Sequence, residues 1–187
     1  MADQGSEGLL SPWLRKQRFK AAMPYLKGRV LDFGCGSGAL AALIDAEHYL
    51  GVEVDDASLQ QARSHFPGHR FVSGMADSAE KFDSIISLAV IEHVSDPSRF
   101  LASLAAHLDS SASSCIVVTT PHPAVDWVHD AGATIGLFSK HANEEHEDLL
   151  DRAKLEMAGK QADLTLAFYK RFLFGANQIA VFNKDHR

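Results

Sequence analysis

The sequence VLDFGCGSG, residues 30–38, decides the fold, because it places a short apolar run directly before three closely spaced glycines. Residues 29–33 are predicted to form a buried strand, and residues 38–46 are predicted to form the helix that follows the glycines. Glycine lets the backbone turn sharply and approach a ligand closely. The free N–H groups and positive dipole end of such a helix would suit a pyrophosphate or the carboxylate of a methionine-like group.

Apolar strands and helical segments alternate along the rest of the chain. We expect helices over 12–25, 57–64, 97–108 and 144–157, and strands over 49–53, 70–72, 82–88 and 115–119. Strands that alternate with helices imply a parallel sheet that is covered on both faces. Two last strands, 164–174 and 178–182, are joined by too short a turn for a parallel crossover, so they should form an antiparallel hairpin. The predicted fold class is α/β, a doubly wound sheet that ends in this hairpin.

Length and composition indicate a single globular domain. The 187 residues suit one domain, with residues 1–27 as an N-terminal helical lead and residues 122–163 as a variable segment on the substrate side. Hydrophobic residues make up 46% and charged residues 22%, which is typical of a folded, soluble chain. The formal net charge of −6 gives no general attraction to nucleic-acid backbones, so we expect no nucleic-acid partner.

Cysteine usage and the termini indicate a cytoplasmic setting. The two cysteines, Cys35 and Cys115, cannot build a disulfide framework and do not have metal-ligand spacing. The first residues lack the basic patch and apolar stretch of a signal peptide. The apolar run over residues 85–91 is too short to cross a bilayer, so no membrane insertion is expected.

Acidic residues flank the glycine loop and help to choose its ligand. Gly34, Gly36 and Ala39 also satisfy the loose dinucleotide fingerprint, so glycine spacing alone leaves both ligand classes open. Asp32 would repel a pyrophosphate but attract a methionyl ammonium group or its waters. Glu53 follows Gly34 by about 20 residues, where an acid can accept both ribose hydroxyl protons of NAD or of S-adenosylmethionine.

These stretches resemble the class I methyltransferases. Residues 30–38 look like the first motif of that family, and residues 50–55 are similar to the following motif. By that match Glu53, not Asp55, holds the ribose, although many members have aspartate where Glu53 stands. The resemblance implies S-adenosylmethionine as cofactor, S-adenosylhomocysteine as product, and a Rossmann-like sheet of seven strands that is mostly parallel.

Two further stretches extend this resemblance. Residues 74–77 are similar to the segment that meets adenine, where Asp77 would accept the exocyclic amino hydrogens and Met75 or Ala76 would lie alongside the ring. Residues 82–94 closely resemble the fourth motif of the branch that includes ubiquinone-pathway O-methyltransferases. The expected cofactor-binding residues are Asp32, Gly34, Cys35, Gly36, Gly38, Glu53, Val54, Ala76, Asp77 and Leu88.

Glu92 and His93 are the candidate catalytic residues. They follow the predicted strand over 82–88, at the sheet edge where ligands bind in such folds. His93 could be a general base for a hydroxyl or a phenol, or it could shape the pocket. Glu92 could act in the same way or cap a helix start. A sulfonium donor carries an activated methyl, so the reaction mainly needs acceptor, methyl and sulfur held in line, with water excluded.

Several other side chains have competing interpretations. Arg15 and Arg18 could reach the methionyl carboxylate, but a basic helix face is the favoured interpretation. Trp127 and Phe138 could line a substrate pocket or pack on the core, and residues 143–148 read as a helix start with Asn143 as its N-cap. No metal is expected, because the spacing of the histidines in this region matches no strong zinc pattern; they are His122, His129, His141 and His146.

The predicted function is methyl transfer to a small-molecule acceptor, at oxygen or nitrogen. RNA or protein methylation is an alternative, but residues 87–90 lack the asparagine-proline-proline-aromatic motif used for exocyclic base amines, and the acidic charge argues against a large nucleic-acid footprint. A nicotinamide oxidoreductase is opposed by Asp32 and by the terminal hairpin. A cofactor-binding regulator without turnover stays open. No motif in the sequence identifies the acceptor.

Overall fold

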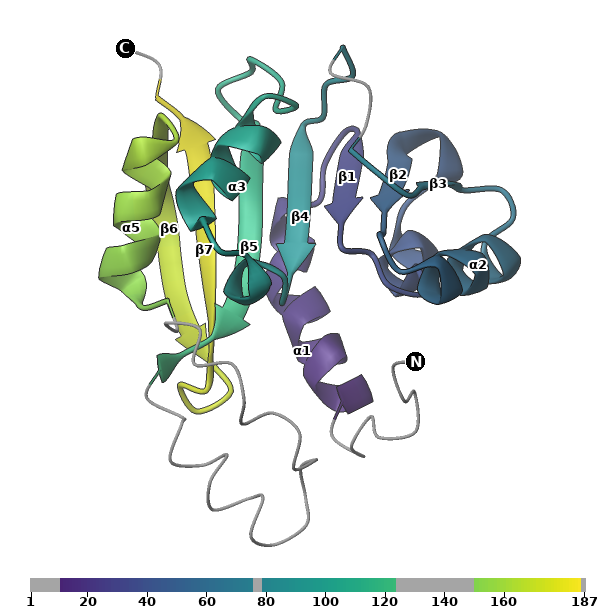
Figure 1. Cartoon of the computed structure of the whole chain (residues 1–187), viewed down its shortest axis with the longest axis horizontal. Coiled ribbons are helices and arrows are strands. Elements are labelled where there is room, and N and C mark those ends of the chain that lie inside the picture. Colours follow the sequence, from purple (N-terminus) through teal and green to yellow (C-terminus); the bar gives the residue numbers. More distant parts are fainter. Residues whose placement is uncertain (1–10, 76–78, 124–149, 186–187) are drawn as a thin grey trace, which may run out of the picture.

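A seven-stranded sheet forms the centre of the computed structural model, which describes residues 11–75, 79–123 and 150–185 (Figure 1). Its strands lie in the order β3-β2-β1-β4-β5-β7-β6. The first five strands pair in parallel, and β7 lies antiparallel between β5 and β6, which confirms the predicted sheet and hairpin. The strands are β1 (Val30–Phe33), β2 (Tyr49–Val52), β3 (Arg70–Val72), β4 (Ser84–Leu88), β5 (Cys115–Pro121), β6 (Leu164–Phe172) and β7 (Asn177–Lys184).

Helices cover both faces of this sheet (Figure 1). On one face α3 (Pro97–Ala105) and α5 (Arg152–Gln161) bury an apolar cluster against the strands. On the other face α1 (Ser11–Ala22) and α2 (Asp56–His65) bury a second cluster. Because both faces are covered, the central strands are apolar on both sides, as expected for a parallel sheet. Short 3-10 helices complete the chain: η1 (Met23–Tyr25), η2 (Ala39–Leu43), η3 (Ala46–His48) and η4 (Ile91–His93).

The helix predicted over residues 38–46 is wrong, because η2 and η3 take its place. Gly38 has a left-handed φ of 79°, and Ile44 is extended with a φ of −138°, so neither residue continues a helix. A 3-10 helix rises about 2.0 Å per residue, compared with about 1.5 Å for an α-helix. The connection from the glycine loop to the start of β2 therefore covers a given distance with fewer residues. The glycine loop therefore lacks the α-helix dipole end that the sequence predicted, and ligand contacts must come from the loop itself.

The helix predicted over residues 144–157 begins and ends later in the part of the chain that the structure describes. Asp151 is its N-cap and accepts a hydrogen bond from the Lys154 N–H at 2.8 Å, and α5 continues to Gln161. A side-chain carboxylate at this position satisfies an N–H group that has no partner within the helix. Residues 143–148, where the sequence placed the cap, lie outside the described residues.

The parallel pairing brings the carboxyl ends of β1, β2, β4 and β5 to one edge of the sheet, the lower edge in Figure 1. The strand order reverses around β1, because β2 lies on one side of it and β4 on the other. In open α/β sheets, ligands bind in the crevice outside the carboxyl ends at such a switch point. The fold therefore places the glycine loop, which follows β1, where a ligand is expected.

Adding a methyl group at Gly51 tests how tightly β2 packs against the side chains of Phe71 and Cys35. An added Cβ would lie 2.5 Å from Cδ1 of Phe71 and 2.9 Å from Sγ of Cys35. Overpacking of this kind costs about 1–3 kcal/mol, so Gly51→Ala should lower the free energy of unfolding in a urea titration by about that amount. Gly68→Ala is the matched control, because its Cβ would meet nothing within 4 Å. Equal losses in the two variants would contradict this prediction.

Candidate functional site

Three left-handed glycines shape the loop after β1. Gly34, Gly36 and Gly38 have φ values of 77°, 53° and 79°, a region that side chains with a Cβ rarely adopt. The Gly34 N–H donates to the Val52 carbonyl at 2.8 Å, which fixes the loop to the end of β2. A Cβ on Gly34 would lie 2.4 Å from Cγ2 of Val90, whereas a Cβ on Gly36 would meet nothing within 4 Å. Gly34 is thus required by packing, and Gly36 faces open space that a ligand can enter.

The carboxylate of Glu53 joins β2 to this loop. Its Oε2 accepts the Gly36 N–H at 2.8 Å, and its Oε1 accepts the N–H groups of Val54 and Asp55 at 2.7 and 3.0 Å. Three N–H donors hold the carboxylate in one orientation, and its oxygens have further lone pairs. Glu53 is half-buried, so this fixed acceptor pair can still reach two neighbouring hydroxyl groups. The side chain of Val54 is 77% exposed and contributes only its backbone here.

A buried acid, Asp32, lies beside the loop near the end of β1. Asp32 is 4% exposed, and its Oδ2 accepts a hydrogen bond from the Tyr49 hydroxyl at 2.7 Å. Burial raises the pKa of Asp32 to about 7; the Tyr49 hydrogen bond lowers that pKa and the charge of Glu53 raises it. Burial and the charge of Asp32 also raise the pKa of the Cys35 thiol, to about 12. Sequence reasoning missed Tyr49, although it precedes Gly51 by two residues, and Gly51 is the partner of Asp32 in the strand register.

These groups include acceptors and open space of the kind expected for an S-adenosyl ligand. The carboxylate oxygens of Glu53 suit a ribose diol, Asp32 suits an ammonium group, and the open space at Gly36 admits a ligand close to the backbone. The predicted residues Asp32, Gly34, Cys35, Gly36, Gly38 and Glu53 therefore lie together, and half-buried Leu88 ends the neighbouring strand β4. Ala76 and Asp77 lie outside the described residues.

A second polar cluster lies where β4 and β5 end. Glu92 on η4 has a buried Oε2 that finds no hydrogen-bond partner among the described residues, and the same holds for the buried hydroxyls of Ser87 and Thr120, which share one face of the sheet. The buried hydroxyl of Thr119 also has no such partner, but it lies on the opposite face. Buried polar atoms are normally hydrogen-bonded, so the cluster is suited to the polar atoms of a ligand. Burial raises the pKa of Glu92. A hydrogen bond with its own backbone, the charges of His93 and Arg18, and the side chain of Thr120 lower that pKa.

Arg18 reaches this cluster from α1. Its Nε donates to Oδ1 of Asn177 at 3.0 Å, which ties α1 to the start of β7. Burial lowers the pKa of the Arg18 guanidinium, and the charge of Glu92 raises it. The favoured interpretation of a basic helix face is therefore wrong for Arg18, because packing of α1 on the sheet half-buries this side chain, while Arg15 is exposed.

The remaining candidates are less well placed. His93 is exposed, and the half-buried His122 donates its backbone N–H to the Ala176 carbonyl at 3.0 Å. In residues 11–75, 79–123 and 150–185, no group of three His, Cys, Asp or Glu side chains could hold a metal ion. Among the helices of those same residues, none is long and apolar enough to cross a membrane. Five candidate residues lie outside the described part of the chain: Trp127, His129, Phe138, His141 and His146.

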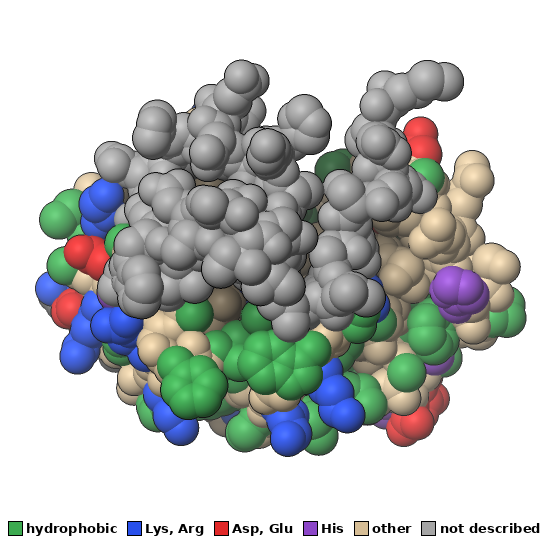
Figure 2. Space-filling model, turned by 90° about the horizontal axis from the view of Figure 1, so that it is seen from below, with side chains coloured by type: hydrophobic (Ala, Val, Ile, Leu, Met, Phe, Trp, Pro, Cys, Tyr) green, Lys and Arg blue, Asp and Glu red, His purple; other side chains and the backbone are tan. Residues whose placement is uncertain are grey.

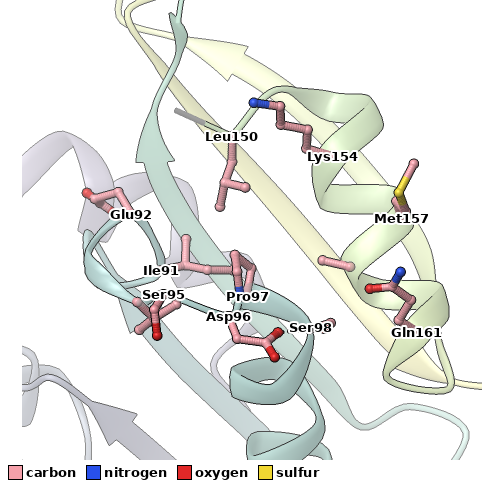
Figure 3. Close-up of a pocket in the computed structure, with 12 residues that line it drawn as sticks. Ile91, Glu92, Ser95, Asp96, Pro97, Ser98, Leu150, Lys154, Met157 and Gln161 are labelled. Carbon is pink, nitrogen blue, oxygen red and sulfur yellow. Dashed lines mark hydrogen bonds between the residues drawn. The ribbon is translucent and has the colours of Figure 1, made fainter. Parts of the chain in front are cut away.

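A cleft of about 610 Å³ opens between η4, the start of α3, and α5 (Figure 3). Leu150 points into it from above and Ile91 from below, whereas Glu92 points away from its centre. Its other walls come from Asp96, Lys154 and Gln161, and the glycine loop contributes no lining residue. The cleft therefore adjoins the Glu92 cluster through the backbone of η4 but is separate from the site around Glu53.

The surface at the carboxyl edge is not uniformly acidic. Viewed toward the ends of the parallel strands, the described surface has hydrophobic side chains next to Lys and Arg side chains (Figure 2). α1 contains Arg15, Lys16, Arg18 and Lys20 and has no acidic residue in its first turn.

Comparison with known proteins places these features in a family. A model of a methyltransferase domain matches residues 8–167. A ubiquinone biosynthesis O-methyltransferase from Ruegeria sp. (strain TM1040) is 33% identical, in a match covering 44% of this chain and 37% of the relative. The ribosomal RNA small subunit methyltransferase C of Shewanella oneidensis is 34% identical, over 67% of this chain and 38% of the relative. The chain thus matches less than half the length of these curated relatives.

Solved structures show the same fold. An S-adenosylmethionine-dependent methyltransferase from Clostridium acetobutylicum ATCC 824 aligns with a TM-score of 0.67 and 11% identity, over 94% of this chain and 96% of that chain. The fold is the Rossmann-like arrangement of the class I methyltransferases, as the sequence predicted.

The raised pKa of Asp32 predicts how stability changes with pH. A carboxyl group whose pKa rises from 3.8 to about 7 on folding destabilises the folded state above pH 3.8, and the penalty grows until about pH 7. Asp32→Asn removes the charge and keeps an acceptor for Tyr49. Its free energy of unfolding should match that of the unsubstituted chain near pH 4 and exceed it by about 2–4 kcal/mol at pH 8. Urea titrations at the two pH values measure this difference, and a pH-independent difference would disprove it.

Proposed function

The chain belongs to the family of S-adenosylmethionine-dependent methyltransferase domains, and we propose that it methylates a small-molecule acceptor at an oxygen or nitrogen atom. The observation that carries this proposal is the Glu53 carboxylate, held by three backbone N–H groups against the open Gly36 loop. Such an acceptor pair is suited to a ribose diol at the switch point of the sheet.

Residues in and beside the loop each bind a different part of the cofactor. Glu53 accepts the ribose hydroxyls, Asp32 faces the methionyl ammonium, and the Gly36 backbone allows close approach. The resemblance assigns adenine to Asp77 and Ala76. Bound S-adenosylmethionine supplies a methyl group that is already activated by its sulfonium. The protein then has to orient the acceptor and exclude water.

The acceptor is assigned to the polar cluster at the ends of β4 and β5. Val90 contacts the glycine loop at Gly34, and Glu92 follows two residues later, so the two sites are adjacent. Burial raises the pKa of Glu92, which makes its carboxylate a stronger base for a hydroxyl or amine proton. The buried hydroxyl of Ser87, which has no partner among the described residues, can hydrogen-bond the acceptor's polar atoms.

A small acceptor is favoured by the packing of α1 beside this cluster. The hydrogen bond from Arg18 to Asn177 joins α1 to β7, and Arg18 interacts with the charge of Glu92, so α1 bounds the cluster on one side. The net charge of −6 opposes binding to a large phosphate backbone. The match to a ribosomal RNA methyltransferase makes RNA the second candidate, and the assay below separates the two.

Glu53→Ala tests the cofactor site. Loss of the acceptor pair should weaken S-adenosylhomocysteine binding by about 1–3 kcal/mol, the cost of leaving polar groups without a partner. Isothermal titration calorimetry measures the change. Asp56→Ala is the matched control, because Asp56 is an exposed acid on the same segment and should leave the affinity unchanged. An unchanged affinity in Glu53→Ala would remove Glu53 from the site.

The acceptor class and the role of Glu92 are tested with methyl-labelled S-adenosylmethionine. The protein is incubated with an ultrafiltered metabolite extract, with ribosomal RNA and with a protein extract. Label should enter the metabolite fraction, and Glu92→Gln should slow that transfer by about 10²-fold or more if Glu92 is the base, while S-adenosylhomocysteine affinity stays the same. His93→Gln is the comparison variant and should have a smaller effect. Label in RNA or protein alone would overturn the small-molecule proposal.

A further inference from the structure

We propose that Tyr49 is a positioning residue that keeps the Asp32 carboxylate charged and aimed at the ammonium group of the cofactor. This inference rests on the proposed function, because it takes Asp32 as the partner of that ammonium. Neither the family match nor the sequence motifs assign a role to Tyr49.

The Tyr49 hydroxyl is aimed at Asp32 by the sheet itself. Asp32 pairs with Gly51 in the parallel register, and Tyr49 lies two residues earlier on β2, so its side chain projects from the same face. Both side chains are 4% exposed, and the hydroxyl donates to Oδ2 of Asp32 at 2.7 Å. The ring makes edge contacts with Phe71 and His69, with centroids 5.6 and 5.5 Å away. The packed ring therefore holds the hydroxyl in place.

When Asp32 is charged, the Tyr49 hydroxyl is the donor of the pair. Burial and the charge of Asp32 raise the pKa of Tyr49, so its hydroxyl keeps its proton and donates it. A donor to a carboxylate stabilises the charged form over the acid. Because Tyr49 binds Oδ2, the remaining lone pairs of the carboxylate are available to an ammonium group.

The other groups that face Asp32 make this donor important. The negative charge of Glu53, at the end of β2, opposes ionisation of Asp32, and burial opposes it more strongly. The Cys35 thiol in the glycine loop stays neutral, because burial raises its pKa to about 12. His69 touches the Tyr49 ring, and its Nε2 lies 2.9 Å from the Ile44 carbonyl. Of these groups, Tyr49 is the one that favours the charged carboxylate.

Tyr49→Phe is the test, because it keeps the ring and removes the hydroxyl. S-adenosylhomocysteine is titrated into both proteins by calorimetry between pH 6 and pH 9. If the variant's Asp32 ionises one pH unit higher, its affinity should be roughly fivefold weaker at pH 7 and within about twofold of the unsubstituted chain at pH 9. Ionisation of the ligand cancels in this comparison, since both proteins bind the same molecule.

Three control variants isolate the hydroxyl's effect. Tyr25→Phe removes a phenol on the same side of the sheet, beside Phe168, and should leave the pH profile unchanged. His69→Gln should also keep the profile, which excludes the imidazole as its source. Asp32→Asn should bind weakly with no step near pH 7.

The outcomes separate the two proposals. Weaker binding in Tyr49→Phe that is restored at pH 9 supports the positioning role. An equal loss at every pH, or no loss at any pH, overturns it and leaves the cofactor site intact. Absence of S-adenosylhomocysteine binding by the unsubstituted chain at every pH would overturn the proposed function and this inference together.

Discussion

The rest of the site depends on the carboxylate of Glu53, which binds the backbone of the loop after β1 to the end of β2. Its three N–H donors come from both segments, and the Gly34 N–H adds a direct bond to Val52. A loop with three left-handed glycines has high conformational entropy when unfolded, so it needs such bonds to remain in one shape. We propose the same residue for the ribose, and we therefore expect loop order and ligand binding to be coupled.

Burial of charged groups is the second theme of this edge of the sheet. Asp32 and Glu92 are acids whose pKa is raised by burial, and Arg18 is a base whose pKa is lowered by it. Each has a specific neighbour that partly offsets this cost: Tyr49 for Asp32, and Arg18 and Glu92 for one another. Titratable groups with shifted pKa values concentrate at functional sites, because catalysis often needs pKa values that differ from those of the same groups in water.

The sequence predicted the sheet well and the connections less well. Buried strands were visible because both faces are apolar, and the short turn before β7 indicated an antiparallel hairpin. The helix expected over 38–46 was wrong, because local apolar spacing does not reveal how far a link must reach to the next strand. The sequence placed the N-cap of the helix expected over 144–157 at Asn143, whereas in the described part of the chain Asp151 caps α5.

Local spacing around a strand end was enough to predict the α/β fold, the glycine loop and the acids beside it, Asp32 and Glu53. Only the tertiary structure revealed that Tyr49 donates to Asp32, that Arg18 binds Asn177 beside Glu92, and that polar atoms of β4 and β5 lack partners among the described residues. The physical reason is that these contacts join elements far apart in the chain. Strand register and helix packing, rather than any local pattern, decide which of them form.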